Sequence, residues 1–406
     1  MGGTRRSQRG LDWLNFFVAD VQTGFGPFVA VYLASQAWTE VQIGFALSLG
    51  TLTAMLSQMP AGAIVDAARD KRRMAFLALV ALAFSAVLLA AWPSTLPVYA
   101  SEMLHGFASC VLNPSIAAIS LALVGREALG ERLGRNARFA SLGGAIAAGL
   151  MGLVGTYLSP AAVFWMTAAL TIPSLISLSR IRGEELRPVQ ATQMAGHGDA
   201  RREGSIRDLL ADRGILIFAG CAALFTLSNA AMLPLAGAAV TQRAGDEANL
   251  IIAACLVVPQ LVVAAISPLV GRAAQQYGRR LVLIVGFSML PVRGVLLAMV
   301  EEPAALIMVQ ALDGISAATL NVMLPLLAAD LTRGTNRFNL CIGFFGLAVG
   351  IGGTISTTLG GAVAAWSSSA DAFLMLGGIG LLCLILAWAA MPETRDQLPK
   401  DMALAQ

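Results

Sequence analysis

The sequence predicts an all-α membrane protein in which twelve transmembrane helices form two six-helix halves related by pseudo-symmetry. Its 406 residues are 57% hydrophobic and only 13% charged, whereas soluble domains contain about a quarter charged residues. Apolar blocks long enough to cross a bilayer as helices recur along the whole chain. In addition, landmarks of the first half return in the second half at a nearly constant spacing. Together these three observations predict a duplicated helical bundle in a membrane.

The apolar blocks divide the chain into twelve predicted spans. They cover residues 11–35, 41–65, 73–92, 96–124, 137–158, 161–181, 214–242, 248–270, 281–300, 304–329, 338–363 and 371–391. We therefore expect one half at residues 1–182 and another at 213–391, joined by a polar segment at 183–212 and followed by a tail at 392–406. The joining segment has the composition of a flexible linker, and its last part, SIRDLLAD, could form a surface helix or begin span seven.

The positions of the basic residues predict how the chain is oriented. All but two of the 27 lysines and arginines lie in segments that the twelve spans place on one side of the membrane. The exceptions are Arg243, in a loop on the other side, and Arg293, within a span. Because basic loops stay on the cytoplasmic side, both termini are predicted to be cytoplasmic, and an odd number of spans would break the pattern.

The two halves repeat each other. Spans four and ten share polar residues, a glycine and an asparagine at the same spacing, about 208 residues apart: Glu102, His105, Gly106 and Asn113 correspond to Gln310, Asp313, Gly314 and Asn321. The loop GAIVDAARDKRR (62–73) corresponds to GRAAQQYGRRLV (271–282), and Gln22 corresponds to Asn229, at nearly the same offset. Parallel repeats of this kind place the substrate path of a transporter between the halves.

The loop after span two carries the most specific motif. Gly62 is followed by Asp66 and then by a basic run, which consists of Arg69, Lys71, Arg72 and Arg73. Twelve spans, a long central loop and this motif resemble the major facilitator superfamily, whose signature is G-x-x-x-D-R-x-G-R-[RK]. Ala67 and Arg69 depart from that signature. The loop of the second half keeps Gly271, Arg279 and Arg280 but has Gln275 in place of the aspartate.

The resemblance implies a transporter of the bacterial inner membrane. It also implies a role for the motif, in which Asp66 lies near the positive end of a helix and latches the halves on the cytoplasmic side when the cavity opens outward. The alternative is a plain basic loop that only sets the orientation.

Two opposite charges are predicted to meet inside the membrane. Spans nine and ten form a hairpin that turns near Glu302, and Arg293 and Asp313 lie at similar distances from this turn. At about 1.5 Å per residue each is roughly 14 Å deep, in a hydrocarbon layer about 30 Å thick. A lone charge there costs at least about 2.5 kcal/mol, which favours a pair. The pair either locks the hairpin or rearranges during a transport cycle.

Three further ionisable residues are candidates for proton coupling. Glu102 and His105 lie one turn apart on one face of span four, and a histidine beside a carboxylate could carry a proton. Alternatively, Glu102 points to the outer interface and His105 bonds to a carbonyl group. Asp20 lies in the cytoplasmic half of span one, where it is either a proton site or a group reached by cytoplasmic water.

Uncharged polar residues are candidates for contact with a substrate. In the resembled family spans one, four, seven and ten line the cavity, and the candidates on these spans are Gln22, Asn113, Asn229 and Asn321. Each could instead form a hydrogen bond between helices. Phe107 and Phe225 could add apolar contacts to a solute, although most aromatic residues in such proteins face lipid or the core.

Other functions are not expected. The five cysteines lie in apolar blocks and only two histidines occur, so we expect no metal and no other cofactor. The chain has no Gly-x-x-x-x-Gly-Lys-Ser/Thr loop, which argues against an ATP-driven pump. Its loops are too short for a catalytic domain, so we expect no enzyme. A net charge of +3 gives no reason to expect binding to nucleic acid.

We therefore expect a monomeric secondary transporter that moves a small organic solute across the plasma membrane by rocking of its halves, coupled to protons. Family base rates favour export, although span five lacks the Gly-Pro pair that drug–proton antiporters of the family carry. Uptake by a proton symporter or an uncoupled facilitator is the alternative within this class. A membrane sensor without transport activity, or a lipid-handling protein on the same scaffold, is the alternative outside it.

Overall fold

The computed structural model describes residues 4–23, 25, 27–186, 211–237, 248–300, 302–333 and 335–395, and these are largely helical. The first half comprises α1 (Arg5–Thr23), α2 (Pro27–Ser35), α3 (Glu40–Ala67), α4 (Lys71–Ala91), α5 (Thr95–Val124), α6 (Leu129–Tyr157) and α7 (Pro160–Ser179). The second half comprises α10 (Arg213–Asn229), α12 (Ala248–Tyr277), α13 (Arg279–Met299), α14 (Pro303–Leu331), α15 (Phe338–Trp366) and α16 (Ser369–Ala390). Since α1 and α2 together fill the place of span one, the helices occupy all twelve predicted positions.

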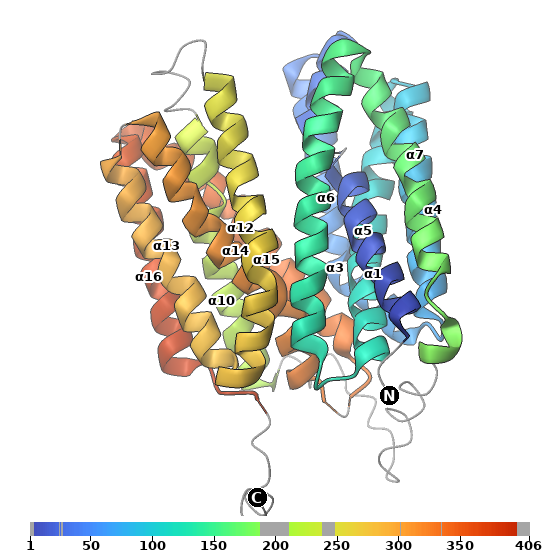
Figure 1. The fold of residues 1–406 in the computed structure, drawn as a ribbon. Helices are drawn as coiled ribbons and strands as arrows, with labels where there is room; N and C mark the ends of the chain where they lie inside the picture. Colours follow the sequence, from blue (N-terminus) through green and yellow to red (C-terminus); the bar gives the residue numbers. More distant parts are fainter. Residues whose placement is uncertain are drawn as a thin grey trace, which may run out of the picture.

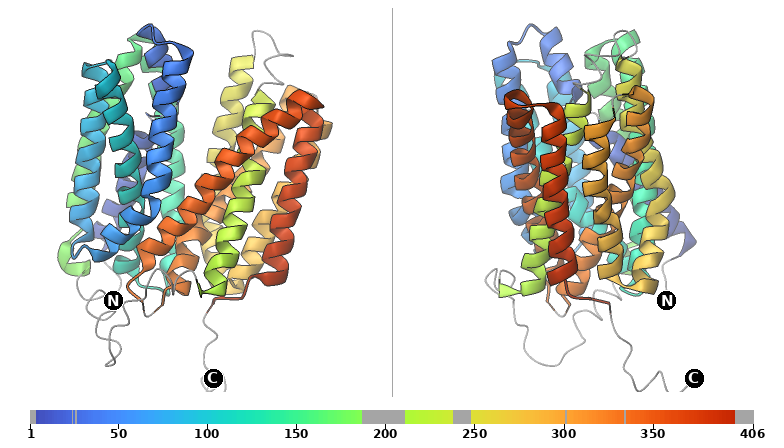
Figure 2. Two further views of the ribbon diagram at one scale, coloured as in Figure 1. Left: turned by 180° about the vertical axis from the view of Figure 1, so that it is seen from behind. Right: turned by 90° about the vertical axis from the view of Figure 1, so that its left-hand side faces the viewer.

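The two halves form two helical bundles that stand side by side (Figures 1 and 2). Ten helices in the described part of the chain are long and apolar enough to cross a bilayer. The start of α1 and the end of α16 lie at one end of the molecule, which we call the terminal end (Figure 1). The halves touch mainly through α6 against α12 and α3 against α15, and their ribbons diverge towards the opposite end (Figure 1).

Spans one and seven are interrupted at corresponding places. In span one α1 ends at Thr23 and α2 begins at Pro27, within the sequence TGFGPF. Proline lacks the N–H that would continue the helix, and glycine is a poor helix former. In span seven α10 ends at Asn229, and a turn at residues 230–231 precedes a short helical segment at 232–237. Both interruptions leave polar side chains near the break.

Helix α6 begins before the predicted span five. The hydropathy of the sequence predicts a span from residue 137, whereas α6 begins at Leu129. Arg132 and Arg135 therefore lie on the helix and not in a loop. Hydropathy excludes them from the span because they are charged, whereas the structure pairs both with Asp12, as described below.

Apolar side chains pack within each half and also across the contact between the halves. Leu14, Leu79 and Leu112 belong to a buried cluster of the first half. Phe218 and Phe287 belong to a second cluster, which is centred in the second half but also includes Leu133 of α6. The contact between the halves at α6 and α12 is therefore partly apolar.

Candidate functional site

Glycines bring the two halves into close contact near the terminal end. A Cβ added to Gly130 of α6 would lie 2.8 Å from the carbonyl oxygen of Gly271 in α12. In the other interface, a Cβ added to Gly62 of α3 would lie 2.8 Å from the carbonyl carbon of Asn339 in α15. Real side chains do not fit at these distances, so larger residues would hold the halves apart.

The halves separate towards the opposite end. Gly152 lies about five helical turns beyond Gly134 on α6 and so points in the same direction. A Cβ added to Gly134 would lie 2.9 Å from Pro268 of α12, yet one added to Gly152 would meet nothing within 4 Å. Gly343 and Gly361 of α15 show the same contrast, because Gly343 packs on α3 and Gly361 faces open space. The space between the halves is therefore closed at the terminal end and open at the other.

Asp66 joins the halves at the closed end. Its carboxylate, at the end of α3, accepts hydrogen bonds from Asn339 N at 3.0 Å, Asn339 Nδ2 at 2.8 Å and Leu340 N at 2.8 Å. These N–H groups begin α15, where the helix dipole favours a negative charge. Lys71 Nζ donates to the carbonyl oxygen of Ala68 at 2.8 Å and holds the turn that follows. The structure thus places Asp66 against a positive helix end of the other half.

The second copy of the motif makes a different contact. Gln275 stands at the position of Asp66 and donates through Nε2 to the carbonyl oxygen of Glu127, just before α6. The turn also differs, because Gly278 has a φ of 97°, which is strained for any residue other than glycine. In the first half that position is Arg69, and Asp70 instead accepts from the N–H groups of the first turn of α4. Arg69, which replaces the second glycine of the family signature, therefore lies in a turn that needs no residue with a positive φ.

The basic residues of the two motif loops have separate surroundings. Arg69 and Arg73 are exposed, and Arg280 donates to the carbonyl oxygen of Trp388. Arg279 is buried, and its Nε donates to Asp330 Oδ2 at 2.9 Å within the second half. Arg72 is partly buried, and its Nη1 lies near Gly183. In these contacts none of them bridges the halves in the manner of Asp66.

The predicted pair of Arg293 and Asp313 is present. Arg293 Nη1 lies 2.8 Å from Asp313 Oδ1, and their side chains are 1% and 17% exposed. The guanidinium also donates to Gln310 Oε1 at 2.6 Å and to Asn229 Oδ1. Asn229 is on α10, Arg293 on α13, and the other two residues are on α14, so the cluster ties three helices together. Asp313 and Asn229 are its partly exposed members.

On the corresponding face of α5, no cation in the described part of the chain forms an ion pair with Glu102, although the Arg293 cluster also contains two unpartnered buried atoms, Arg293 Nε and Gln310 Nε2. Glu102, His105, Ser109 and Asn113 lie within a narrow arc of this helix. Buried polar atoms of the first three, Glu102 Oε1, His105 Nδ1 and Ser109 Oγ, have no hydrogen-bond partner in the described part of the chain. Glu102 packs against Gly50 of α3, while the His105 ring stacks on Phe25 with centroids 3.7 Å apart. Glu102 and His105 therefore do not contact each other as a pair, because Glu102 packs on α3 and His105 on the break between α1 and α2.

The polar candidates differ in their exposure and in their hydrogen bonds. Gln22 Nε2 donates to Asn113 Oδ1 at 3.3 Å, and both Asn113 and Asn321 are exposed on otherwise well-buried helices. Asp313 and Asn321 are eight residues apart in sequence and share one face of α14. Asn229 is already bonded to Arg293. The side chain of Asp20 lies outside the described part of the structure.

Comparison with known proteins agrees with this architecture. The family model for the Major Facilitator Superfamily matches residues 12–242 and 216–404. The chain belongs to the major facilitator superfamily. It is 34% identical to an uncharacterized MFS-type transporter of Mycobacterium tuberculosis over 96% of this chain and 94% of that protein.

Solved structures of the superfamily share its fold. The human organic anion transporter MFSD10 (TETRAN) superposes with a TM-score of 0.71 at 15% identity, covering 95% of this chain and all of that chain. The proton:xylose symporter XylE gives 0.71 at 14% identity, covering 98% of each chain. The fucose:proton symporter FucP of E. coli gives 0.70 at 16% identity, covering 96% of this chain and 98% of that chain. The protein is thus a multi-pass membrane protein with the twelve-helix fold of the superfamily.

The aromatic candidates do not lie beside the polar ones in this superfamily fold. Phe225 is buried in the core of the second half, where its ring centroid is 5.3 Å from that of Phe287. Phe107 is exposed, but at 100° per residue it is about 120° around α5 from Asn113. Phe225 is therefore not accessible to a solute in this conformation, and Phe107 points away from the polar face.

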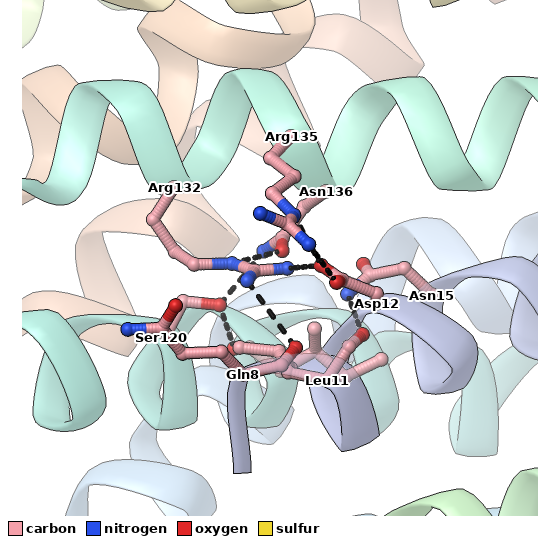
Figure 3. Close-up of polar contacts among 9 residues, drawn as sticks. Gln8, Leu11, Asp12, Asn15, Ser120, Arg132, Arg135 and Asn136 are labelled. Atoms are coloured by element: carbon pink, nitrogen blue, oxygen red, sulfur yellow. Dashed lines mark hydrogen bonds and ion pairs between the residues drawn. The ribbon is translucent and has the colours of Figure 1, made fainter. Parts of the chain in front are cut away.

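A charged cluster at the terminal end was missed in the sequence (Figure 3). Asp12 of α1 is buried and forms ion pairs with Arg132 Nη2 and Arg135 Nη2, both at 2.5 Å. Arg132 Nε also donates to Asn136 Oδ1 at 2.8 Å, and Asn136 Nδ2 donates to Ser120 Oγ at 2.8 Å. The cluster joins α1, α5 and α6 within the first half. The spacing of Arg132, Arg135 and Asn136 on one helix face was the available signal.

Proposed function

We propose that this superfamily member is a secondary transporter that carries a small organic solute along the path between its halves, coupled to protons. The arrangement at Asp313 carries the proposal. A buried guanidinium is paired with a carboxylate that is 17% exposed, deep within a helical bundle whose halves meet at one end only. Ionisable groups at such depth are costly and are a sign of an ion or substrate pathway.

The closed end is the one we assign to the cytoplasm. The basic residues of the described loops gather at this end together with the start of α1 and the end of α16, as the positive-inside rule requires of a cytoplasmic face. A solute would then enter from the outside and meet the exposed side chains of Asn113, Asn321 and Asp313. Closure around it and opening at the terminal end would require Asp66 to leave the start of α15.

The ion pair offers a physical route to coupling. When Asp313 takes up a proton it loses its charge, and Arg293 is left with the neutral oxygens of Asn229 and Gln310. An uncompensated guanidinium in an apolar interior is unfavourable by several kcal/mol, so the cluster would rearrange or admit water. Either response changes the packing of α10, α13 and α14, which are the helices that the cluster joins.

Solved structures of the same fold support coupling of transport to protons but do not indicate the direction of transport. XylE and FucP are described as proton symporters, and MFSD10 as an organic anion transporter. Proton coupling on this scaffold thus has precedents for sugars. We favour export by family base rates, with uptake as the alternative within the same mechanism.

The test begins with a screen of sugars, organic anions and organic cations for solutes that raise the thermal stability of the purified protein. Each stabilising solute is then offered to proteoliposomes with and without an imposed pH gradient. We expect faster net movement of at least one solute with the gradient. If the rate of solute movement does not depend on the pH gradient, the protein is a facilitator. If a solute stabilises the protein but is not moved, a sensor is favoured.

A further inference from the structure

The interface of α6 with α12 contains a hydrogen bond that the family motif does not supply. Arg138 Nε of the first half donates to the carbonyl oxygen of Ala264 in the second half at 2.8 Å. Ala264 lies well inside α12, where a carbonyl oxygen ordinarily accepts from the N–H four residues later. That residue is Pro268, which has no N–H. Pro268 thus leaves one carbonyl oxygen open, and Arg138 occupies it from across the interface.

The bond lies at the edge of the closed zone. Gly130 and Gly134 of α6 pack against Gly271 and Ser267 of α12, and Arg138 is one helical turn further from the terminal end. Beyond it on α6, Gly149 and Gly152 have open space around them. Arg138 therefore makes its contact where the two halves begin to separate.

The equivalent interface of the repeat has no such bond. Pro60 of α3 occupies the place of Pro268, so a carbonyl oxygen is freed there as well. The residue at the place of Arg138, however, is Gly346 of α15, which has no side chain and packs on the carboxamide of Gln58. The proline is repeated and the arginine is not, so the duplicated backbone alone does not account for the arginine.

We infer that Arg138 and the carbonyl group freed by Pro268 form a latch that holds the terminal end closed, in addition to Asp66, and that opening of this end breaks it. The inference rests on the proposed transport cycle, for which it names a gating contact. Opening would leave the Ala264 carbonyl oxygen without a partner until water reaches it, which opposes opening in an apolar environment. The latch thus stabilises the conformation that is closed at the terminal end.

The experiment measures opening of the terminal end in the full-length protein in lipid nanodiscs. Ser267 is fully buried between α6 and α12, so Ser267→Cys reports opening through its rate of reaction with a membrane-impermeant maleimide. In this background Arg138→Met removes the donor, and Pro268→Ala restores an N–H for the Ala264 carbonyl oxygen. Hydrogen bonds to charged groups change an equilibrium by roughly 10- to 100-fold, so we expect each variant to react faster by up to this factor.

The double variant tests whether Arg138 and Pro268 act through the same hydrogen bond. If they do, Arg138→Met with Pro268→Ala reacts no faster than the faster single variant. Arg135→Met is the matched control, because Arg135 is on the same helix but bonds to Asp12 within its own half, and its rate should stay at the parental value. The native Cys221, buried in the core of the second half, should stay unreactive in every variant and so excludes unfolding.

Two results would overturn the inference. One is a parental rate for Arg138→Met, and the other is a double variant in which the two accelerations multiply. Failure of the proposed transport function has a different signature, namely no solute movement by the parental protein in proteoliposomes while the labelling pattern remains as expected. That result would reject transport and leave the latch standing.

Discussion

Replacing Asp313 with asparagine tests whether the buried pair works in transport or only holds α13 and α14 together. The change keeps an oxygen acceptor near Arg293 Nη1, which lies 2.8 Å from Asp313 Oδ1, and removes the negative charge. Arg293 is 1% exposed, so water does not compensate its charge. Its remaining acceptors, Asn229 and Gln310, are neutral amides.

The expected cost follows from these contacts. Removing one partner of a buried ion pair destabilises a protein by about 3–5 kcal/mol. Asp313 is partly exposed and two amide oxygens still accept from the guanidinium, so we expect the lower end, about 3 kcal/mol. That corresponds to a change of roughly 100-fold in an equilibrium constant. Arg293→Met should cost a similar amount, because it leaves the carboxylate without its cation.

A double-mutant cycle separates the two roles of the pair. Stability is measured by reversible unfolding of the purified protein, and transport with the solute found in the stabilisation screen. A double variant with Arg293→Met and Asp313→Asn has no buried charge at this site, so its loss of stability should be smaller than the sum of the losses in the two single variants. If the pair is only a lock, the double variant regains transport as well. If the pair rearranges during transport, it regains stability but not gradient-driven transport. Parental stability and transport in Asp313→Asn would refute the reasoning altogether.

Three further changes test the terminal end. Asp66→Asn weakens the contact with the start of α15, so the Ser267→Cys reporter should react faster by roughly tenfold; a parental rate would remove Asp66 from closure. Asp12→Asn leaves the buried Arg132 without its anion and should lower the midpoint of thermal unfolding more than Asp70→Asn, which alters an exposed helix cap; equal shifts would argue against a buried ion pair. Burial raises the pKa of Glu393, but N–H donors of Arg279, Arg395 and Arg280 and the Arg279 charge outweigh it and leave that pKa below its ordinary value of 4.5. The stability that Glu393 contributes is therefore complete above the unfolded-state pKa and is lost as pH falls through the folded-state pKa, so Glu393→Gln should flatten the acid limb of the stability profile and leave the slope near pH 7 unchanged.

The parts of the fold that depend on distance along the chain could be predicted from the sequence. Helices rise by a fixed amount per residue, so a turn near Glu302 was enough to place Arg293 and Asp313 at one depth. The repeat likewise predicted that Gly62 and Gly271 occupy related places, and both lie at contacts between the halves. Hydropathy identified the spans because a bilayer demands long apolar helices.

The parts that depend on how a helix is rotated against its neighbours could not be predicted. Glu102 and His105 share a helix face, but Glu102 packs against Gly50 of α3 and His105 stacks on Phe25 in the break between α1 and α2. Phe225 lies on a predicted cavity helix, yet it turns towards Phe287. Nearly every residue of such a span is apolar, so the sequence carries no amphipathic signal that fixes this rotation.

The difference between the halves bears on which ionisable groups need a functional explanation. The repeat places Ser85 of α4 where the second half has Arg293, so the first half has no guanidinium for Glu102, which stands at the position of Gln310. Where the second half compensates its carboxylate, the first half leaves Glu102 Oε1 and His105 Nδ1 buried without partners in the described part of the chain. The fold does not require a carboxylate at the position of Glu102, because the repeat has an uncharged glutamine there. Buried polar atoms are ordinarily satisfied, so we propose that a bound proton, water or solute partners Glu102 and His105.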